Sequence, residues 1–481
     1  MSIIIPANSA VGGGYAVDNS CRFDGTAAYL NRTQGTSTNL TKFAWSGWIK
    51  RSKLGADQTV TMNYASASNY GYFYFRSGDD IRIFDRGAGG DTVAISDMLF
   101  RDTSAWYHIA LIIDTTQATD TNRLKLYVNG ILQGLNGVTY PVENAALGWK
   151  VANTSNTFLM RTNSADGYVG GYLAEVAYVD GTANAITDFG EFDSDSGVWK
   201  PIDVSGLTFG NEGYYVDFED SANLGNDASG GTDFTENSLA AIDQTTDTCT
   251  NNFCTINPLW RANQTLTFSE GNTKGVGVSA HRPNNSTFAP SAGKWYMEGK
   301  LISGSSNKWW MGYADQQWID SNQNLASGTN MDWGGGNIAG GTNQRNVSLN
   351  NGWSNQLNLY PNSAITSFFS SSSVANDIIA MAVDLDNQKA WWSQNGVWRN
   401  GSATASTTFN ASYPDTTQLD AGRNYYIATG SENSTWLVNY GNPAYAITSS
   451  NADGNGYGNF EYEVPSGFFS LCTKNLSEVL S

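Results

Sequence analysis

A pattern that occurs twice constrains the fold of this chain more than any other feature. Each copy begins with an apolar run of strand length that ends at an aspartate, at residues 106–114 and 377–384. A second strand follows, with side chains alternating between two faces, and Asn-Gly then closes a tight hairpin at 129–130 and 395–396. Both central residues of a type I′ turn need positive φ, which Asn and Gly tolerate best. Each half is therefore predicted to contain a three-strand antiparallel meander.

The composition fits two β-domains and limits their partners. Of the 481 residues, 40% are hydrophobic, which is enough for full cores, and the 51 Gly suit many tight turns. The net charge of -18 repels phosphate backbones and anionic membranes, so we expect no nucleic-acid partner. No apolar run approaches the ~18 residues of a membrane span, so we expect no membrane insertion. The N-terminus also lacks the basic region and apolar core of a signal peptide.

The order of motifs in the first half resembles the laminin-G-like, concanavalin-type lectin/glucanase sandwich. The motifs are Phe23-Asp-Gly25, Trp45-Ser-Gly-Trp-Ile-Lys50, Trp106-Tyr-His-Ile-Ala110, Leu124-Lys-Leu-Tyr-Val-Asn-Gly130 and Gly171-Tyr-Leu-Ala-Glu-Val176. A hairpin is expected from the run 70–75 to the run 81–84. Further motifs, Gly197-Val-Trp-Lys-Pro201, Tyr214-Tyr-Val-Asp-Phe218 and Leu224-Gly-Asn-Asp-Ala-Ser-Gly230, resemble a laminin-G-like family abundant in tailed phages, especially marine ones.

The second half resembles a SPRY-type sandwich. The motifs are Gly293-Lys-Trp-Tyr-Met-Glu298, Trp310-Met-Gly-Tyr313, Trp391-Trp-Ser-Gln-Asn-Gly-Val-Trp398 and Tyr440-Gly-Asn-Pro443. We therefore expect an all-β fold of two antiparallel β-sandwich domains in tandem, of the jelly-roll, concanavalin A-like type. The expected parts are an N-terminal assembly segment (1–17), a laminin-G-like sandwich (18–218), an acidic polar linker (219–258) and a SPRY-type sandwich (259–481).

The sequence offers little support for catalysis. A retaining glucanase needs two carboxylates about 5–5.5 Å apart, and the nearest stretch, Glu191-Phe-Asp-Ser-Asp195, lies in a Gly- and Ser-rich loop. Glu461 and Glu463 share a strand face but lie near the chain end. His108 sits among core residues and is interpreted as structural, while His281 is expected on a surface loop. We therefore predict a protein that is not an enzyme.

Metal and disulfide chemistry are left open by the residues. Asp193 and Asp195 alternate with serines, as calcium ligands in loops do, so calcium is weighed here against a solvated turn. No other cofactor is expected, and two His make a zinc site improbable. Cys249 and Cys254 are close enough in sequence to bridge in an oxidising compartment.

Tryptophans among Asn, Gln and Gly form the sharpest candidate binding constellation. Sugar rings stack on indoles while amides bond their hydroxyls, so this mixture suits a glycan or partner site. Core packing is the alternative. The candidate residues are Trp309, Trp318, Asn330, Trp333 and Trp353.

The resemblance to phage proteins implies a non-enzymatic virion surface protein. It would be a capsid decoration, head fibre or tail-associated adhesin, a homo-oligomer on the particle, in contact with host-surface glycans or other virion proteins. The alternatives are a glucanase-like polysaccharide depolymerase and a bacterial cell-surface lectin. A depolymerase should show a carboxylate pair in a cleft, and a cell-surface lectin should carry an export signal.

The tryptophan hypothesis predicts the outcome of truncating a ring. If Trp333 and Trp353 are exposed and covered by a partner, each is worth about 1–3 kcal/mol of binding. Trp333→Ala or Trp353→Ala should then weaken binding to host cells or a glycan array at least several-fold, with the melting temperature unchanged. Rings that are core instead would cost about 3–5 kcal/mol of stability when removed, so a thermal melt beside a binding assay separates the two cases.

Overall fold

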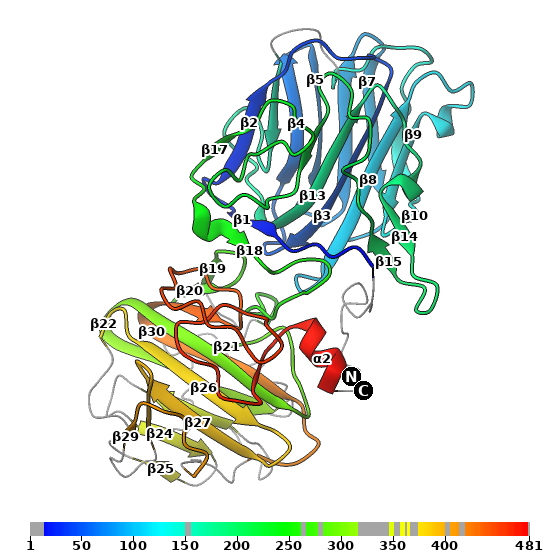
Figure 1. Ribbon diagram of the computed structural model, residues 1–481. Coiled ribbons are helices and arrows are strands. Elements are labelled where there is room, and N and C mark those ends of the chain that lie inside the picture. Colours follow the sequence, from blue (N-terminus) through cyan, green and yellow to red (C-terminus); the bar gives the residue numbers. More distant parts are fainter. Residues whose placement is uncertain are drawn as a thin grey trace. The chain divides into compact units, whose positions relative to one another are not determined.

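Both predicted meanders are present in the computed structural model of the chain (Figure 1). The first consists of β8 (Trp106–Asp114), β9 (Leu124–Val128) and β10 (Ile131–Leu132), and the second of β26 (Ile378–Asp384), β27 (Lys389–Gln394) and β28 (Val397–Arg399). The turn residues have the positive φ that a type I′ turn requires: 48° and 76° at Asn129 and Gly130, and 50° and 75° at Asn395 and Gly396.

Each turn asparagine also anchors its own meander. The side-chain oxygen of Asn129 accepts the backbone N–H of His108 at 2.8 Å, and that of Asn395 accepts the backbone N–H of Ile378 at 2.9 Å. The same contact therefore ties the turn to the opposite strand in both copies.

Two compact units divide the chain, and each is described separately. The described residues up to Asn252 form the first unit, and those from Phe253 onward form the second. The structure describes residues 14–149, 155–260, 266–277, 282–315, 346–350, 356–360, 363–365, 374–399, 405–412 and 419–479. The described part contains mostly antiparallel strands and little helix, so the predicted all-β fold is confirmed.

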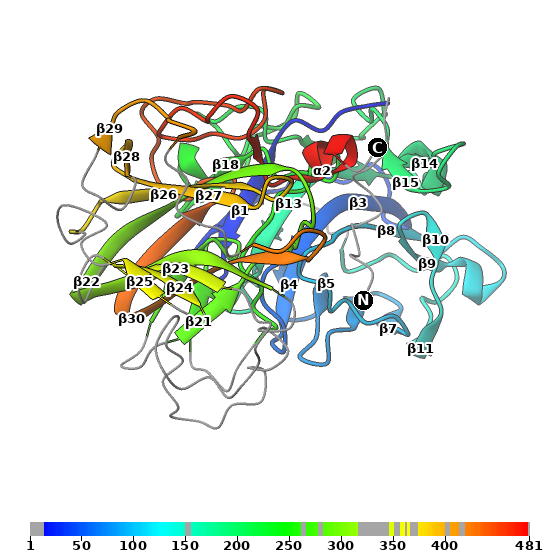
Figure 2. The same ribbon diagram turned by 90° about the horizontal axis from the view of Figure 1, so that it is seen from below.

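The first unit has two large sheets, called sheet A and sheet B (Figures 1 and 2). In spatial order, sheet A contains β10, β9, β8, β3 (Lys42–Arg51), β13 (Gly170–Asp180), β1 (Ser20–Asp24) and β18 (Gln244–Thr245), with β16 (Tyr214–Val216) beside β13. Sheet B contains β11 (Leu135–Thr139), β7 (Gly90–Ser96), β6 (Ile81–Gly87), β5 (Asn69–Phe75), β4 (Gln58–Ser66), β12 (Asn156–Leu159), β2 (Tyr29–Thr33) and β17 (Thr235–Asn237). Smaller elements are the pair β14 (Gly190–Phe192) and β15 (Trp199–Pro201) and the 3-10 turns η2 (Asp120–Asn122), η3 (Ile186–Asp188) and η4 (Ala241–Asp243).

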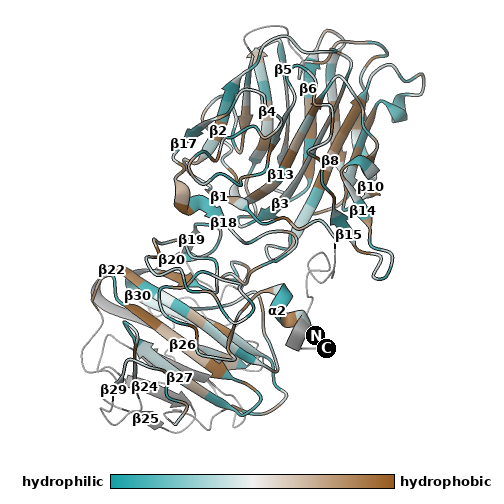
Figure 3. Cartoon of the chain, in the orientation of Figure 1, coloured by the Kyte–Doolittle hydropathy of each residue, from teal (hydrophilic) through white to brown (hydrophobic). Residues whose placement is uncertain are grey.

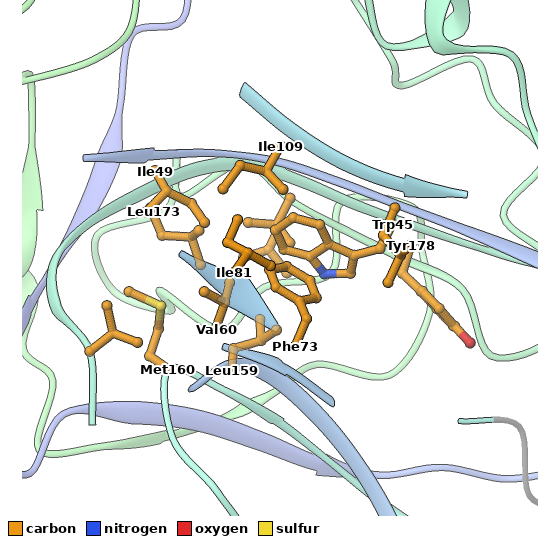
Figure 4. Packing of buried hydrophobic residues seen from close by; sticks show 14 of the residues in the cluster. Trp45, Ile49, Val60, Phe73, Ile81, Ile109, Leu159, Met160, Leu173 and Tyr178 are labelled. Carbon is orange, nitrogen blue, oxygen red and sulfur yellow. The ribbon is translucent and has the colours of Figure 1, made fainter. Parts of the chain in front are cut away.

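Sheets A and B enclose the main core of the first unit. Apolar residues alternate with hydrophilic ones along several of their strands (Figure 3), as expected where one face of a sheet is buried. Trp45 and Ile49 of sheet A meet Val60, Phe73 and Ile81 of sheet B (Figure 4). Trp45 and Phe73 pack edge to face with ring centroids 4.8 Å apart, a geometry that aromatic pairs prefer.

The predicted hairpin between runs 70–75 and 81–84 is confirmed. β5 and β6 pair with Phe75 opposite Ile81 and Phe73 opposite Ile83, and all four side chains are buried in the core. The intervening residues 70, 72 and 74 therefore point to the other side of sheet B.

The second unit is built on one large sheet with two long strands. In spatial order this sheet contains β19 (Thr267–Ser269), β20 (Lys274–Val276), β30 (Tyr425–Asn439), β22 (Lys294–Asp315), β26, β27, β28 and β29 (Ala405–Ser406). Branching from it are β21 (Arg282–Asn285), β23 (Asn346–Asn350), β24 (Gln356–Tyr360), β25 (Ser363–Ile365) and β31 (Phe469–Ser470), and helix α2 is Thr473–Val479. Trp295, Trp392 and Trp436 are fully buried in its core.

The expected linker at 219–258 differs from what the structure shows. β17 pairs with β2 and β18 with β1, so this stretch supplies strands to both sheets of the first unit. Phe234 lies in the main core, and the carboxylate of Asp227 forms a buried ion pair with Arg32 at 2.9 Å. The two units divide at Asn252 and Phe253. A polar composition suggested a linker because the sequence does not reveal that these polar groups are paired inside the fold.

The N-terminal segment is partly described. Within residues 14–17, Val17 is buried and its N–H donates to Thr250 Oγ1 at 3.1 Å, so this end of the segment packs on the first unit. Residues 1–13 of the expected assembly segment lie outside the described residues. Among the helices of the described chain, none has the length and apolar character of a membrane span.

Alanine substitutions at two glycines with positive φ distinguish the cost of backbone strain from the cost of steric overlap. Gly130 has φ 76°, and a Cβ there would lie 2.2 Å from the Trp199 ring. Gly197 has φ 69° with open space around it. We expect Gly197→Ala to lower the free energy of unfolding by about 1–2 kcal/mol, because only the left-handed backbone is strained. Gly130→Ala should lower it clearly more. Chemical denaturation measures both, and equal losses would contradict the overlap at Trp199.

Candidate functional site

A groove of about 640 Å³ lies on the outer side of sheet B. We call it the tyrosine groove. Strands β4, β5 and β6 form its floor, and the segment from Thr162 to Gly167 forms one wall. The lining residues are Asp57, Thr59, Met62, Tyr64, Ala67, Tyr70, Tyr72, Tyr74, Arg86, Thr162, Ser164, Asp166 and Gly167.

Three tyrosines follow one another along β5 on the groove side. Their alternation with Gly71, Phe73 and Phe75 comes from the two-residue period of a strand. The ring centroids of Tyr70 and Tyr72 are 6.0 Å apart with planes inclined by 16°, and those of Tyr72 and Tyr74 are 5.3 Å apart at 28°. The strand therefore presents a continuous row of stacked rings.

Neighbouring strands hold this row in place. Tyr64 of β4 stands opposite Tyr70, and the two ring centroids are 6.1 Å apart. Phe84 of β6 stands opposite Tyr72, with ring centroids 5.5 Å apart. The Phe84 ring also stacks on the Tyr70 ring, with centroids 5.4 Å apart. The guanidinium of Arg86 lies 5.5 Å from the centroid of Tyr70. Because each ring has a neighbour on at least one side, the row is formed before any ligand arrives.

The tyrosine hydroxyls remain available for hydrogen bonds. Among the described residues, no partner is found for the hydroxyls of Tyr64, Tyr70, Tyr72 or Tyr74. Burial raises the pKa of Tyr72, so its hydroxyl stays protonated and can both donate and accept. The groove thus combines flat aromatic faces with phenol hydroxyls that have no partner among the described residues.

The wall of the groove is fixed by backbone contacts. Thr59 N–H donates to the Gly167 carbonyl at 2.7 Å, and Thr162 N–H donates to the Asp166 carbonyl at 3.0 Å. The hydroxyl of Thr162 also donates to the Asp166 carboxylate. The loop therefore holds polar groups opposite the rings.

The charges at the groove are already paired or solvated. Arg86 forms two hydrogen bonds with Asp91, Nε to Oδ1 and Nη2 to Oδ2, both at 2.7 Å. Asp57 is exposed and accepts the Ser77 N–H at 2.7 Å. This arrangement suits a ligand recognised by ring faces and hydroxyl groups rather than by a strong charge. A sugar has both an apolar C–H face and many hydroxyls.

His108 has the structural role that the sequence predicts. It is fully buried, and burial lowers its pKa to about 3. The indole N–H of Trp199 donates to Nδ1 at 3.1 Å, so the remaining ring proton is on Nε2, 2.8 Å from Ser46 Oγ. A Ser-His-Asp triad needs the reverse, with Nδ1–H donating to a carboxylate and Nε2 accepting from serine.

Buried carboxyl groups hold the fold rather than a substrate. Glu175 lies at an irregularity of β13 with φ 51°, accepts the Tyr215 hydroxyl at 2.7 Å, and burial raises its pKa to about 8. Burial likewise raises the pKa of Asp85 to about 7, and its Oδ1 accepts the Trp149 N–H at 2.9 Å. In the second unit burial raises the pKa of Glu298, which accepts the Tyr462 N–H at 2.9 Å.

The candidate calcium residues occupy a turn with its own hydrogen bonds. Asp193 Oδ1 accepts the N–H groups of Asp195 and Ser196 at 3.1 and 2.9 Å, and its Oδ2 lies 3.4 Å from Lys200 Nζ. The Ser196 N–H is the main cause that lowers the pKa of Asp193 to about 2. Within the described residues, no group of three or more His, Cys, Asp or Glu side chains could hold a metal. Calcium at Asp193 and Asp195 stays a prediction.

Most of the predicted tryptophan site falls outside the described residues. This applies to Trp318, Asn330, Trp333 and Trp353. The backbone of Trp309 lies in β22, opposite Ser431 of β30. His281 is also outside the described residues. The sequence reasoning missed the tyrosine groove, although the alternation of Tyr and Phe over residues 70–75 was the signal for it.

The cysteines are buried. Cys249 is a free thiol, so it forms no disulfide with Cys254.

A family model described as the concanavalin A-like lectin/glucanases superfamily matches residues 24–185. This match covers β4, β5, β6 and the segment from Thr162 to Gly167, and therefore the whole tyrosine groove. The search of curated proteins gives no match.

Several solved structures are similar to parts of the chain. A heptameric SAP-like pentraxin from Limulus polyphemus has 13% identity and a TM-score of 0.29, covering 42% of this chain and 93% of that chain. A putative carbohydrate binding protein from Bacteroides ovatus has 14% identity and a TM-score of 0.33, covering 46% and 58%. The SPRY domain of human HERC1 has 11% identity and a TM-score of 0.25, covering 38% and 96%.

The buried Glu175 predicts a pH dependence of stability. Its pKa of about 8 in the folded protein lies above the ordinary 4.5, so the folded state holds a proton that the unfolded state releases. The contribution of Glu175 to stability should be fully present below pH 4.5 and be lost as pH rises towards 8, by up to about 1.4 kcal/mol per pH unit.

Glu175→Gln should remove this part of the pH profile, because an amide does not ionise. Denaturant unfolding of both proteins between pH 5 and 8 measures the difference, on the order of a few kcal/mol over the range. Glu143→Gln, at a side chain that is 50% exposed, is the matched control and should leave the profile unchanged. Parallel profiles for wild type and Glu175→Gln would contradict a protonated Glu175.

Proposed function

We propose that this chain is a non-enzymatic binding protein whose first unit recognises glycans in the tyrosine groove. The observation that carries the proposal is the row of Tyr70, Tyr72 and Tyr74, stacked along one strand with hydroxyl groups available. A sugar can lay its C–H face on such rings while its hydroxyls bond the phenols and the wall of the groove. The match to the concanavalin A-like lectin/glucanases model supports this assignment of the groove.

The groove's form favours several sugar units over one. Its floor spans three strands and its volume of about 640 Å³ is in the range of about 300–1,000 Å³ usual for small-molecule sites. A sugar that covers a ring buries apolar surface, and this burial contributes roughly 25 cal/mol of binding free energy per Å². Individual contacts are weak, so affinity should rise with the number of rings covered.

The central ring of the row provides the sharpest test. Tyr72→Ala removes the ring that touches both neighbours, and we expect at least a tenfold loss of affinity for the glycans that the wild type selects on an array. Tyr72→Phe keeps the ring and removes the hydroxyl, so its loss should be smaller. Isothermal titration with the full chain measures both.

The control is Tyr127→Phe, since Tyr127 is a half-buried tyrosine of sheet A, remote in the topology from β5. It should bind as the wild type does. Unchanged glycan binding by Tyr72→Ala, with the protein folded, would remove the tyrosine groove as the site.

We further infer that the protein is carried on a phage particle, as a capsid decoration, head fibre or tail-associated adhesin. The motifs at 197–201, 214–218 and 224–230 support this, and so does the low charged fraction of 15%. Many copies on one particle would raise the avidity of weak glycan contacts. Electron microscopy of particles labelled with an antibody against the chain tests this location, and unlabelled particles that lack the chain would refute it.

A further inference from the structure

A buried lysine stands between two aromatic rings on the outer face of sheet A. Lys50 of β3 lies directly opposite Trp106 of β8 on one side and Tyr172 of β13 on the other. Residues directly opposite in antiparallel strands place their side chains on the same face of the sheet. Lys50 Nζ is 5.4 Å from the centroid of Tyr172, and the Lys50 side chain is only 1% exposed.

A carboxylate and a carboxamide from a distant part of the chain close over this lysine. Nζ donates to Asp247 Oδ2 at 2.7 Å and to Asn252 Oδ1 at 2.7 Å. Asp247 and Asn252 are both completely buried. Lys50 and Asn252 are 202 positions apart in sequence, so only the fold brings them together.

Further contacts orient the two partners of Lys50. The Trp106 indole N–H donates to Asp247 Oδ1 at 3.0 Å, which leaves Oδ2 facing the amine. The Ser20 hydroxyl donates to the Asp247 carbonyl at 2.6 Å. Asn252 Nδ2 donates to the Ser104 carbonyl at 2.7 Å, which directs the amide oxygen towards Lys50.

We propose that Lys50 and Asn252 form an autocatalytic isopeptide bond with Asp247 as the catalytic carboxylate. The Lys50 ammonium gives a proton to Asp247, and the neutral amine attacks Cγ of Asn252. A C–N bond forms between Nζ and Cγ, and the bond from Cγ to Nδ2 breaks. Asp247 returns this proton to the departing nitrogen, which also takes the second proton that Nζ loses as the amide forms, so the products are a secondary amide and one ammonium ion. No oxidant, metal or other reactant is needed.

The geometry meets three requirements of such a reaction: contact between the reacting groups, a proton carrier and the exclusion of water. The nucleophile and the amide are held in contact, which replaces a bimolecular encounter by an intramolecular one. A carboxylate within 2.7 Å of the amine can act first as base and then as acid. The surrounding Trp106, Tyr172 and Cys249 form an apolar cluster that keeps water from the reacting atoms.

The bond would tie the end of the first unit to its central strand. Asn252 is the last residue of that unit, and β3 lies between β8 and β13 in sheet A. A cross-link that closes a long loop restricts the unfolded chain and raises resistance to unfolding. Without the reaction, the same contacts would be a buried ion pair with a hydrogen-bonded amide. The two cases differ by one covalent bond and therefore by mass.

Mass spectrometry of the denatured, purified full chain tests the proposal. We expect the wild-type mass to be lower than the sequence mass by one ammonia, and a proteolytic digest to contain one peptide that joins Lys50 to Asn252. Lys50→Arg keeps the charge but cannot form the amide, and Asp247→Asn removes the proton carrier. Both variants should have the full sequence mass and no joined peptide.

The matched control is Lys42→Arg. Lys42 also lies on β3 and pairs with an aspartate, Asp114, at 3.3 Å, but its side chain is 33% exposed. This variant should lose one ammonia as the wild type does. If the Lys50 and Asp247 variants fail to fold, the wild-type mass and digest decide alone. A wild-type mass equal to the sequence mass would overturn the proposal. So would an ammonia loss without the joined peptide, as succinimide formation at an asparagine would give.

Discussion

Trp149 is the residue on which the three strands below the tyrosine groove depend. Its ring lies against Gly71 of β5 so closely that a Cβ on Gly71 would be 1.8 Å from the indole. Its backbone N–H donates to Asp85 of β6 at 2.9 Å, and its carbonyl accepts from Asn63 of β4 at 2.8 Å. The same residue therefore locks β4, β5 and β6 from the core side. The tyrosines on the opposite side therefore project from strands that Trp149 holds together.

Gly71 leaves room for the Trp149 ring on the core side of β5, between the two tyrosines that face the groove. A larger residue between Tyr70 and Tyr72 would displace Trp149 and with it the contact to Phe73, whose ring centroid is 6.4 Å from that of Trp149. Because protein interiors are close-packed, such a change would also shift the surrounding strands. One face of β5 thus packs in the core, and its other face forms the floor of the groove.

Buried charges hold the later part of the first unit to the sheets. The Arg32 guanidinium pairs with Asp227, donates to the carbonyls of residues 212, 213 and 232, and lies 4.9 Å from the ring centroids of Tyr214 and Phe234. Lys50 and Asp247 act similarly near the end of the unit. A buried pair of this kind adds little net stability compared with apolar residues, but breaking one partner leaves an uncompensated charge. These pairs therefore specify where an otherwise polar stretch must lie.

The sequence by itself determined the local structure of this protein. The meanders, the Asn-Gly turns and the hairpin from β5 to β6 follow from alternation and from the φ that each turn needs, which are properties of neighbouring residues. The structural role of His108 followed from the apolar residues around it in β8. Alternation at residues 70–75 separates two faces, but it does not tell which face meets the core, because both carry aromatic rings. Only the tertiary structure decided that Phe73 packs inward on Trp45 and that Tyr72 lies outside. Likewise, only the fold pairs Arg32 with Asp227 and brings Lys50 to Asn252, since contacts between residues some 200 positions apart leave no trace in local composition.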